Sequence, residues 1–160
     1  MTAKQNAATQ TSASQTLRAH ATVHDAKAAI AFYIKAFGAV ELFRLVEPAG
    51  RVGHAEIQIG DSVLMLNDEY PDFGAKSPAS VGGSPVAFHI QVPDADAAVD
   101  RAVKAGATVV RPAQDEFYGD RMGMVACPFG YRWSLAMSKE QVSPAEMQKR
   151  WTKMLEGGKA

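Results

Sequence analysis

The chain has 160 residues and a formal net charge of zero at pH 7, because 17 Lys and Arg residues balance 17 Asp and Glu residues. This balance argues against a large basic face, although it leaves room for a local basic patch, so we expect neither nucleic acid nor an anionic membrane as a partner. The one cysteine, Cys127, cannot close an intrachain disulfide, and no apolar run reaches the roughly 20 residues of a membrane span. These features predict a cytoplasmic protein whose apolar content, 47%, is enough to build one core.

The chain begins with a polar segment, residues 1–16, that is rich in Ala, Thr, Gln and Ser. It lacks the apolar core of a signal peptide, and we expect a disordered tail. A strand is predicted over 17–23. Asp25 then provides a helix N-cap, and Gly38 marks the helix end, where glycine readily takes the left-handed conformation. Three further strands, separated by turn residues, are predicted over 40–46, 51–59 and 62–67.

The same succession returns after a linker rich in Pro, Gly and Ser, residues 69–84. A strand over 85–92 precedes Asp94, which lies 69 positions after Asp25 and again caps a helix. Gly106 marks the end of this second helix. Three strand candidates complete the second copy: 108–112, 122–126 and 131–136.

Because both the element order and the cap residues recur, the predicted fold class is α+β with two tandem βαβββ modules. The modules, about 17–68 and about 85–137, form one domain over 17–137 with a cupped, mostly antiparallel sheet. A C-terminal helical extension, 138–160, follows, with Ser143 as its cap. An apolar stripe at helical spacing runs along it: Met147, Trp151, Met154 and Leu155. This stripe packs on its own domain, covers the cup or contacts a partner subunit, and the sequence leaves these alternatives open.

Three stretches carry a family resemblance: A-x-x-F-Y-x-K-A-F-G-A over 29–39, H-A-E-I-x-I-G-D-S-V-L-M-L over 54–66, and P-F-G-Y-R-W-S-L-A over 128–136. In this order they resemble the vicinal oxygen chelate superfamily of glyoxalase I, extradiol dioxygenases and bleomycin-resistance proteins, and most closely its PhnB-like branch. The resemblance implies the fold and a cup for a small-molecule ligand. For a bleomycin-resistance-like member it also implies a homodimer. It does not fix an activity, because this fold hosts isomerases, oxygenases, transferases and binders.

In catalytic members of the superfamily, four residues from the first and last strands of the two modules hold a divalent metal. The resemblance places these positions at Arg18 and Met65 in the first module and at Ala87 and Ser134 in the second. These side chains lack the imidazole and carboxylate ligands that such metals prefer, and a guanidinium repels a cation. We therefore expect no metal at the usual positions and no cofactor, with a displaced divalent metal as the open alternative.

A shift of two residues along the first strands keeps the same face of the sheet and leads from Arg18 to His20 and from Ala87 to His89. Together with Glu56, these histidines would form a displaced site of two imidazoles and one carboxylate. The competing interpretation makes each histidine part of a hydrogen-bonded polar wall of the cup.

Period-two alternation along the strands predicts the ligand-binding side chains Arg18, His20, His54, Glu56, Met65, His89, Arg132 and Ser134. Tyr118 and Arg121 belong to a Tyr-Gly-Asp-Arg stretch, which forms a loop salt bridge or contacts the ligand at the rim of the cup.

Three functions follow from these residues. A metal-free, homodimeric protein that binds a small organic molecule is favoured by the missing metal ligands. The alternative is a metal-dependent lyase, isomerase or dioxygenase that uses His20, His89 and Glu56. A metal-free enzyme would use His54 and Glu56, the candidate catalytic residues, as an acid–base pair. The sequence leaves open whether the protein is an enzyme and which ligand it binds.

Overall fold

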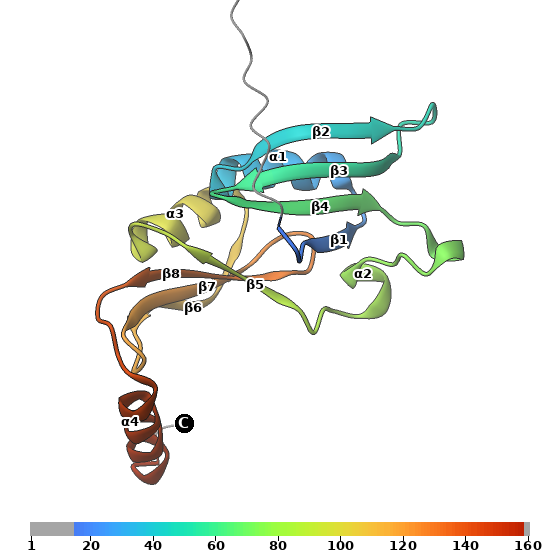
Figure 1. Ribbon diagram of the computed structural model, residues 1–160. Coiled ribbons are helices and arrows are strands. Elements are labelled where there is room, and N and C mark those ends of the chain that lie inside the picture. The colour runs from blue at the N-terminus through green and yellow to red at the C-terminus, as the bar shows by residue number, and fades with distance from the viewer. Residues whose placement is uncertain (1–14, 159–160) are drawn as a thin grey trace, which may run out of the picture.

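The computed structural model describes residues 15–158 (Figure 1). Most of the tail predicted to be disordered, residues 1–14, lies outside the described residues. Module 1 contains β1 (Ala19–Val23), α1 (Ala26–Phe37), β2 (Val40–Val46), β3 (Val52–Ile59) and β4 (Ser62–Asp68). The linker contains η1 (Pro71–Phe73) and α2 (Pro78–Val81). Module 2 contains β5 (Ala87–Gln91), α3 (Ala95–Ala105), β6 (Thr108–Asp115), β7 (Asp120–Ala126) and β8 (Arg132–Ser138), and α4 (Pro144–Glu156) follows it.

The predicted α+β class with two βαβββ modules is confirmed. Sheet 1 has the strand order β1-β4-β3-β2, and sheet 2 has the equivalent order β5-β8-β7-β6. In each sheet the first strand pairs parallel with the last, and the other pairs are antiparallel. Strand β6 runs past Pro112, where the prediction ended, because β6 is an edge strand with a register shift between Arg111 and Gln114. A proline without an N–H is tolerated at such a position.

The helix caps form as the sequence predicts. The Asp25 carboxylate accepts a hydrogen bond from the Ala28 amide, and Asp94 accepts one from the Ala97 amide. Gly38 ends α1 with a φ of 69°, a left-handed conformation that a residue with a Cβ rarely adopts. These caps fix the two helices at equivalent places in the two modules.

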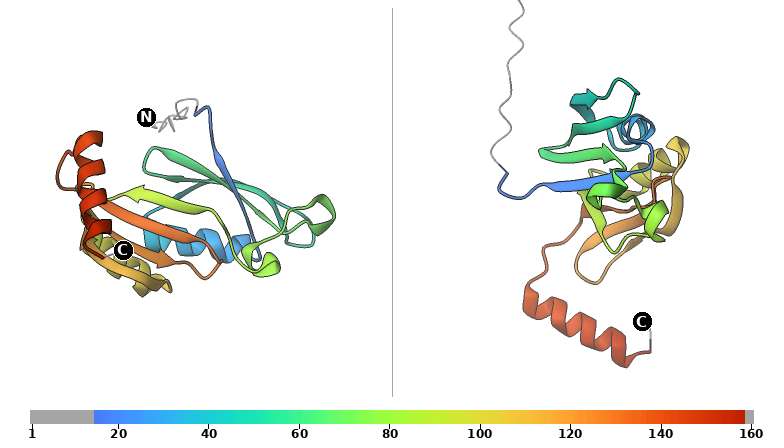
Figure 2. Two further views of the ribbon diagram at one scale, coloured as in Figure 1. Left: turned by 90° about the horizontal axis from the view of Figure 1, so that it is seen from below. Right: turned by 90° about the vertical axis from the view of Figure 1, so that its right-hand side faces the viewer.

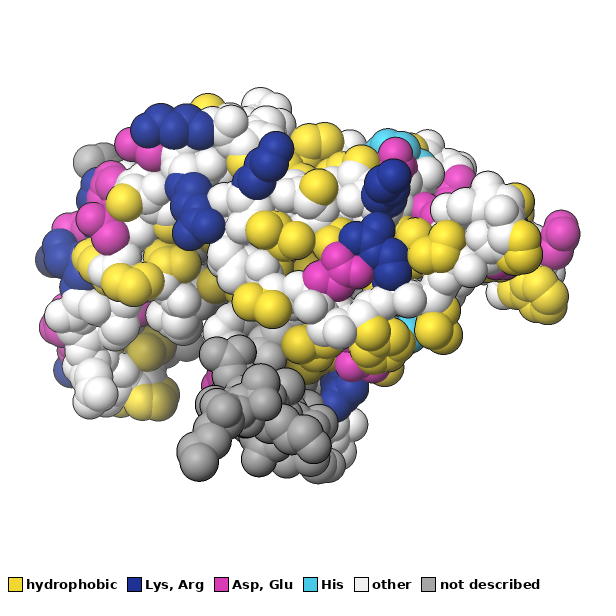
Figure 3. All heavy atoms as spheres, turned by 90° about the horizontal axis from the view of Figure 1, so that it is seen from above, with side chains coloured by type: hydrophobic (Ala, Val, Ile, Leu, Met, Phe, Trp, Pro, Cys, Tyr) yellow, Lys and Arg dark blue, Asp and Glu magenta, His cyan; other side chains and the backbone are white. Residues whose placement is uncertain are grey.

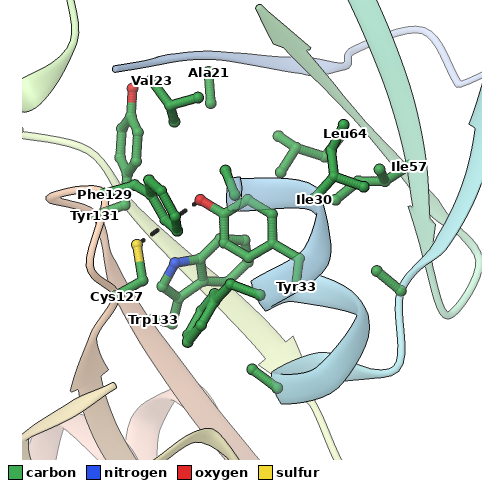
Figure 4. Close-up of a cluster of buried hydrophobic side chains, with 14 of the residues drawn as sticks. Ala21, Val23, Ile30, Tyr33, Ile57, Leu64, Cys127, Phe129, Tyr131 and Trp133 are labelled. Atoms are coloured by element: carbon green, nitrogen blue, oxygen red, sulfur yellow. Dashed lines mark hydrogen bonds between the residues drawn. The ribbon is translucent and has the colours of Figure 1, made fainter. Parts of the chain in front are cut away.

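One aromatic core joins the two modules (Figure 4). Tyr33 of α1 is fully buried beside Trp133 of β8, with ring centroids 5.1 Å apart. Its hydroxyl hydrogen-bonds the Cys127 thiol, and burial raises the pKa of Tyr33 well above its ordinary value. The Tyr131 hydroxyl donates to the Thr22 carbonyl of β1 across 3.0 Å. The modules therefore share their interior rather than folding as separate units.

The shared core determines where the two sheet faces that carry no helix point. Helix α1 lies behind sheet 1 and α3 lies above sheet 2, so both helix-covered faces border the common interior (Figure 1). The faces without helices open to different sides of the molecule (Figure 2). Within residues 15–158 no strand of one sheet pairs with a strand of the other. A single cup between the two modules is therefore not closed inside one chain.

Helix α4 extends away from sheet 2 and contains no buried residue (Figure 2). Ser143 caps it, as predicted, by accepting a hydrogen bond from the Glu146 amide. Among the described residues, no helix is both long enough and apolar enough to cross a membrane.

Candidate functional site

The face of sheet 1 opposite α1, here called face 1, carries half of the predicted ligand-binding side chains. Its rows follow from the strand register: His20 lies beside Met65, Met65 beside Glu56, and Glu56 beside Phe43. A second row contains His54 beside Leu45 of the edge strand β2. Face 1 consists of Arg18, His20, Thr22, Phe43, Leu45, His54, Glu56, Gln58, Met65 and Asn67. It thus has a polar centre and an apolar margin on β2.

Glu56 is the electrostatic centre of face 1. The Arg18 guanidinium donates to both Glu56 carboxylate oxygens at 3.4 Å, and His54 Nε2 lies 3.6 Å from Glu56 Oε1. The side chain of Glu56 is only 15% exposed, so the Arg18 guanidinium compensates a largely desolvated charge. His20 contacts His54 edge-on, with ring centroids 5.6 Å apart. The structure therefore brings together four of the predicted residues, including the candidate acid–base pair of His54 and Glu56.

The face of sheet 2 without a helix, here called face 2, has a different chemistry. Its central residues come from β5, β7 and β8: His89, Gln91, Met122, Met124, Ser134 and Ala136. Arg111 of β6 pairs with Met124 and forms a 3.0 Å ion pair with Glu116. The Tyr118 hydroxyl donates to Met122 Sδ at 3.5 Å. Face 2 is thus lined by thioethers and bordered by one ion pair and one phenol.

Tyr118 stands where face 2 meets the chain before β7. Partial burial, and after it the Glu116 carboxylate, raise the pKa of the Tyr118 hydroxyl. The phenol therefore stays protonated at neutral pH and can donate a hydrogen bond to a ligand on face 2. The ligand contact predicted for Tyr118 stays a prediction.

Arg121, the other member of the Tyr-Gly-Asp-Arg stretch, lies away from face 2. Its guanidinium donates to Asp96 of α3 at 2.6 and 2.8 Å and to Asp115 at 3.1 Å. Alternation along β7 places it on the helix-covered side, opposite Met122. These contacts support the salt-bridge interpretation for Arg121. Arg132, at the start of β8, pairs with Ala87 and is exposed.

The strand register shows which residues lie beside the positions at which the family resemblance placed the metal ligands. The parallel pair β1–β4 sets His20 opposite Met65, and the pair β5–β8 sets His89 opposite Ser134. Each histidine, rather than Arg18 or Ala87, is thus the direct neighbour of the last-strand position. A thioether and a hydroxyl stand where a carboxylate ligand would be required. These residues do not fit the usual divalent metal.

The displaced site of His20, His89 and Glu56 is not gathered within one chain. His89 lies on face 2, where its Nε2 is 3.2 Å from the Gln91 side-chain amide. In the part of the chain that the structure describes, no three His, Cys, Asp or Glu side chains are arranged to hold a metal ion.

Sequence reasoning missed two side chains that border the faces, Phe43 and Arg111. Phe43 contacts His54 at a centroid distance of 5.7 Å, and Arg111 pairs with Glu116. Both residues follow a register shift, between Glu41 and Phe43 and between Val109 and Arg111. A bulge interrupts the period-two alternation, so the pattern of the sequence assigns such residues to the wrong face. Phe43 and Arg111 occupy equivalent positions in the two modules, and this equivalence is the sequence signal that could have revealed them.

A family model described as Glyoxalase/Bleomycin resistance protein/Dioxygenase superfamily matches residues 15–135. The chain belongs to this superfamily. An uncharacterized protein of Mycobacterium tuberculosis is 48% identical to this superfamily member over 135 residues, 82% of this chain and 79% of the relative. An uncharacterized protein of Arabidopsis thaliana is 32% identical over 124 residues, 72% of this chain and 73% of the relative.

Solved structures share the superfamily fold. The crystal structure of the Arabidopsis gene product aligns with a TM-score of 0.60, covering 74% of this chain and 93% of that one at 32% identity. A glyoxalase-related enzyme of Fulvimarina pelagi aligns with a TM-score of 0.62, covering 79% of this chain and 89% of that one at 24% identity. Membership therefore establishes the two-module fold of this superfamily member and leaves its ligand open.

Proposed function

We propose that this superfamily member binds a small organic molecule in a cup between face 1 of one copy and face 2 of a second copy, without the usual metal. The observation that carries this proposal is the pair of substitutions at the metal positions, Met65 beside His20 and Ser134 beside His89. The proposal places the protein with bleomycin-resistance-like binders of the PhnB-like branch. Its one thiol, Cys127, is buried and free, which is compatible with the reducing cytoplasm.

A homodimer is supported by the free edges of the two sheets. Strands β1 and β5 are edge strands, so each has one side without a sheet partner. A cleft of about 800 Å³ lies beside them, lined by residues of both strands, including Ala19 of β1 and His89 of β5. Unpaired edges favour the addition of another strand. In a twofold dimer, β1 of one copy can join β5 of the other and bring face 1 opposite face 2.

The two faces would offer a ligand complementary groups. Face 1 contributes the Arg18–Glu56–His54 cluster and His20, which can donate and accept hydrogen bonds. Face 2 contributes the polarizable side chains Met122 and Met124 and the Tyr118 hydroxyl. Sites with a few fixed polar groups among apolar and thioether surfaces suit organic ligands with an aromatic or aliphatic body and polar substituents.

Binding is tested by a thermal-shift screen with aromatic and glycopeptide antibiotics, followed by calorimetry on any hit. A hit is expected to weaken by about tenfold or more in Glu56→Gln, because that change removes the negative charge that pairs with the Arg18 guanidinium and replaces one acceptor oxygen by an amide group. The matched control is Asp72→Asn, an exposed carboxylate in the linker, which should leave affinity unchanged. If no compound in a broad panel shifts the melting temperature of the folded, dimeric protein, the proposal is contradicted.

Metal analysis separates this proposal from the metal-dependent lyase, isomerase or dioxygenase. Protein purified without chelator is expected to contain no stoichiometric zinc, nickel, iron or manganese. A stoichiometric metal that is lost in His20→Ala or His89→Ala would contradict the metal-free binder and support the metal-dependent enzyme.

The contact between His54 and Glu56 favours a second candidate, a metal-free enzyme. Their 3.6 Å separation suits proton transfer through a shared substrate or water. Chemical conversion of a bound ligand, abolished in both His54→Gln and Glu56→Gln, would support this enzyme. A ligand recovered unchanged after prolonged incubation supports the binder.

A further inference from the structure

A groove of about 790 Å³ separates α4 from the rest of module 2. One wall is the turn before β7, with Phe117, Tyr118 and Asp120, and the other is a side of α4, with Met147 and Trp151. The segment that leads from β8 to α4 lines the groove as well. Figures 1 and 2 show α4 standing away from sheet 2 at the end of this segment. All of these residues belong to one chain, so the groove exists without a second copy.

Hydrogen bonds hold the two walls of the groove in place. Arg150 of α4 donates to the Glu140 carboxylate at 2.9 and 3.0 Å and to the Phe117 carbonyl at 3.2 Å. The Gly119 carbonyl accepts the amides of Lys139 and Glu140 at 3.0 and 2.9 Å. The helix and the turn are therefore tied to each other by polar contacts, while the space between them stays open.

Three aromatic rings form a continuous surface in this groove. The ring of Phe117 lies in the middle, edge-on to that of Tyr118 at a centroid distance of 5.1 Å. On its other side the Trp151 ring lies 5.2 Å away, tilted by 37°. Trp151 remains 42% exposed, so much of its indole is free to contact a ligand. Such ring faces attract cations, and an indole attracts them most strongly.

Asp120 brings a negative charge beside these rings. It pairs with Ser138 at the start of β7, and alternation places its side chain on the same side of the sheet as Met122. The side chain is half-buried, and within residues 15–158 no hydrogen bond or ion pair involves its carboxylate. Asp120 lies near the Tyr118 hydroxyl, since its charge, after burial and the Glu116 carboxylate, helps to raise the pKa of that group. The groove thus contains a carboxylate without a counter-ion next to aromatic faces.

The cationic side chains around the groove already have partners. Arg150 is paired with Glu140, and Arg111 forms a 3.0 Å ion pair with Glu116. Among the described residues that line the groove, none is a Lys or an Arg. Figure 3 looks onto the side of the molecule opposite α4, where Lys and Arg side chains do lie among hydrophobic ones. The charge of the groove therefore favours a cation from outside the chain.

We propose that this groove binds an organic ammonium ion whose charged nitrogen lies beside Asp120. The alkyl groups on the nitrogen contact the rings of Phe117, Tyr118 and Trp151. An alkylated ammonium ion suits both features, because it is weakly hydrated and gains from ring faces as well as from the carboxylate. A metal ion would instead require several oxygen ligands around it. The site lies outside the proposed cup and does not depend on the homodimer.

Choline is the probe that tests the site, and the two tryptophans of the chain provide the readout. In a nitrogen–proton correlation NMR spectrum each indole N–H gives one signal, and Trp151→Phe identifies that of Trp151. Choline is expected to shift the Trp151 signal saturably, with a Kd of about 1 mM, and to leave that of the buried Trp133 unmoved. The matched control ligand is the neutral isostere of choline, in which a tert-butyl group replaces the trimethylammonium group. This isostere is expected to bind at least about fivefold more weakly.

Two variants separate the contributions of charge and of aromatic surface. Asp120→Asn is expected to weaken choline binding by about threefold or more, because it removes the unpaired charge. Its matched control is Asp72→Asn, which makes the same change at an exposed carboxylate in the linker and should leave the Kd unchanged. Phe117→Leu keeps an apolar side chain and the Trp151 reporter, and it is also expected to weaken binding by about threefold.

Four results would overturn the site. The first is an unmoved Trp151 signal at about tenfold the expected Kd, and the second is an equal response to choline and its neutral isostere. The third is an equal Kd in Asp120→Asn and Asp72→Asn. In the fourth, the Trp151 signal moves with protein concentration in the absence of choline, which would mean that a second copy covers the groove. A failure of the antibiotic screen or of dimer formation would contradict only the proposed cup.

Discussion

Substitution of Trp133 tests the hydrophobic core that the two modules share. The side chain is 2% exposed, and the rings of Phe88 and Phe37 lie 4.5 and 4.6 Å from it. Trp133→Ala should cost about 3–5 kcal/mol through lost burial and the cavity left behind. For a chain of this size, that loss corresponds to a fall in Tm of roughly 6–20 °C. Trp133→Phe keeps an aromatic ring there and is predicted to cost less than about 2 kcal/mol.

The smaller cost of Trp133→Phe has a specific physical reason. Within residues 15–158, Trp133 Nε1 has no hydrogen-bond partner, so the substitution removes a buried donor that gains nothing from the protein. Urea unfolding followed by circular dichroism measures both variants, with Phe73→Ala as an exposed control expected to change stability by less than about 0.5 kcal/mol. Equal costs for Trp133→Ala and Trp133→Phe would refute the argument from the unpaired donor. A cost below about 1 kcal/mol for Trp133→Ala would refute the shared core.

Three further predictions concern single contacts. Hydrogen bonds from Arg121 lower the pKa of Asp96, so their stabilisation is present above the ordinary aspartate pKa and is lost as pH falls through the lowered one. Carboxyl NMR titration should show the pKa of Asp96 rise toward the ordinary aspartate value in Arg121→Gln. Gly119 has a φ of 101°, and a Cβ there would meet the Glu140 carbonyl, so Gly119→Ala should destabilise the protein by about 1–3 kcal/mol in urea unfolding. Tyr131→Phe removes the hydrogen bond to β1 and should cost about 1 kcal/mol by the same method, whereas no change would show that this contact contributes nothing to the joint between the modules.

The fold could be predicted because its signals are local and occur twice. Asp25 and Asp94 cap equivalent helices, and Gly38 and Gly106 end them, so one copy supports the interpretation of the other. The packing of the modules could not be predicted in this way. It depends on long-range contacts such as Tyr33 with Trp133, which alternation along a strand does not reveal. Alternation predicts which side a residue faces within its sheet, but not what lies opposite that side.

In the candidate site, too, local contacts could be predicted from the sequence and long-range contacts could not. Alternation correctly placed His54 beside Glu56 and put His20 on the same face. It paired His20 with His89 across one cup, whereas the common core turns their faces to different sides of the chain. Arg121 could be placed only with α3 in view, because its partner Asp96 lies 25 positions away in the sequence.

The difference between the two faces limits how a guest can lie in the proposed cup. Face 1 is ionic around Glu56, while face 2 is dominated by Met122 and Met124. The halves of each cup are therefore unlike, even though the two cups of a twofold dimer are identical. A ligand with one polar and one apolar end is held in a single orientation. A ligand with two equivalent ends loses favourable contacts at one of them. Chemical asymmetry, rather than size alone, is thus the property that selects among candidate guests.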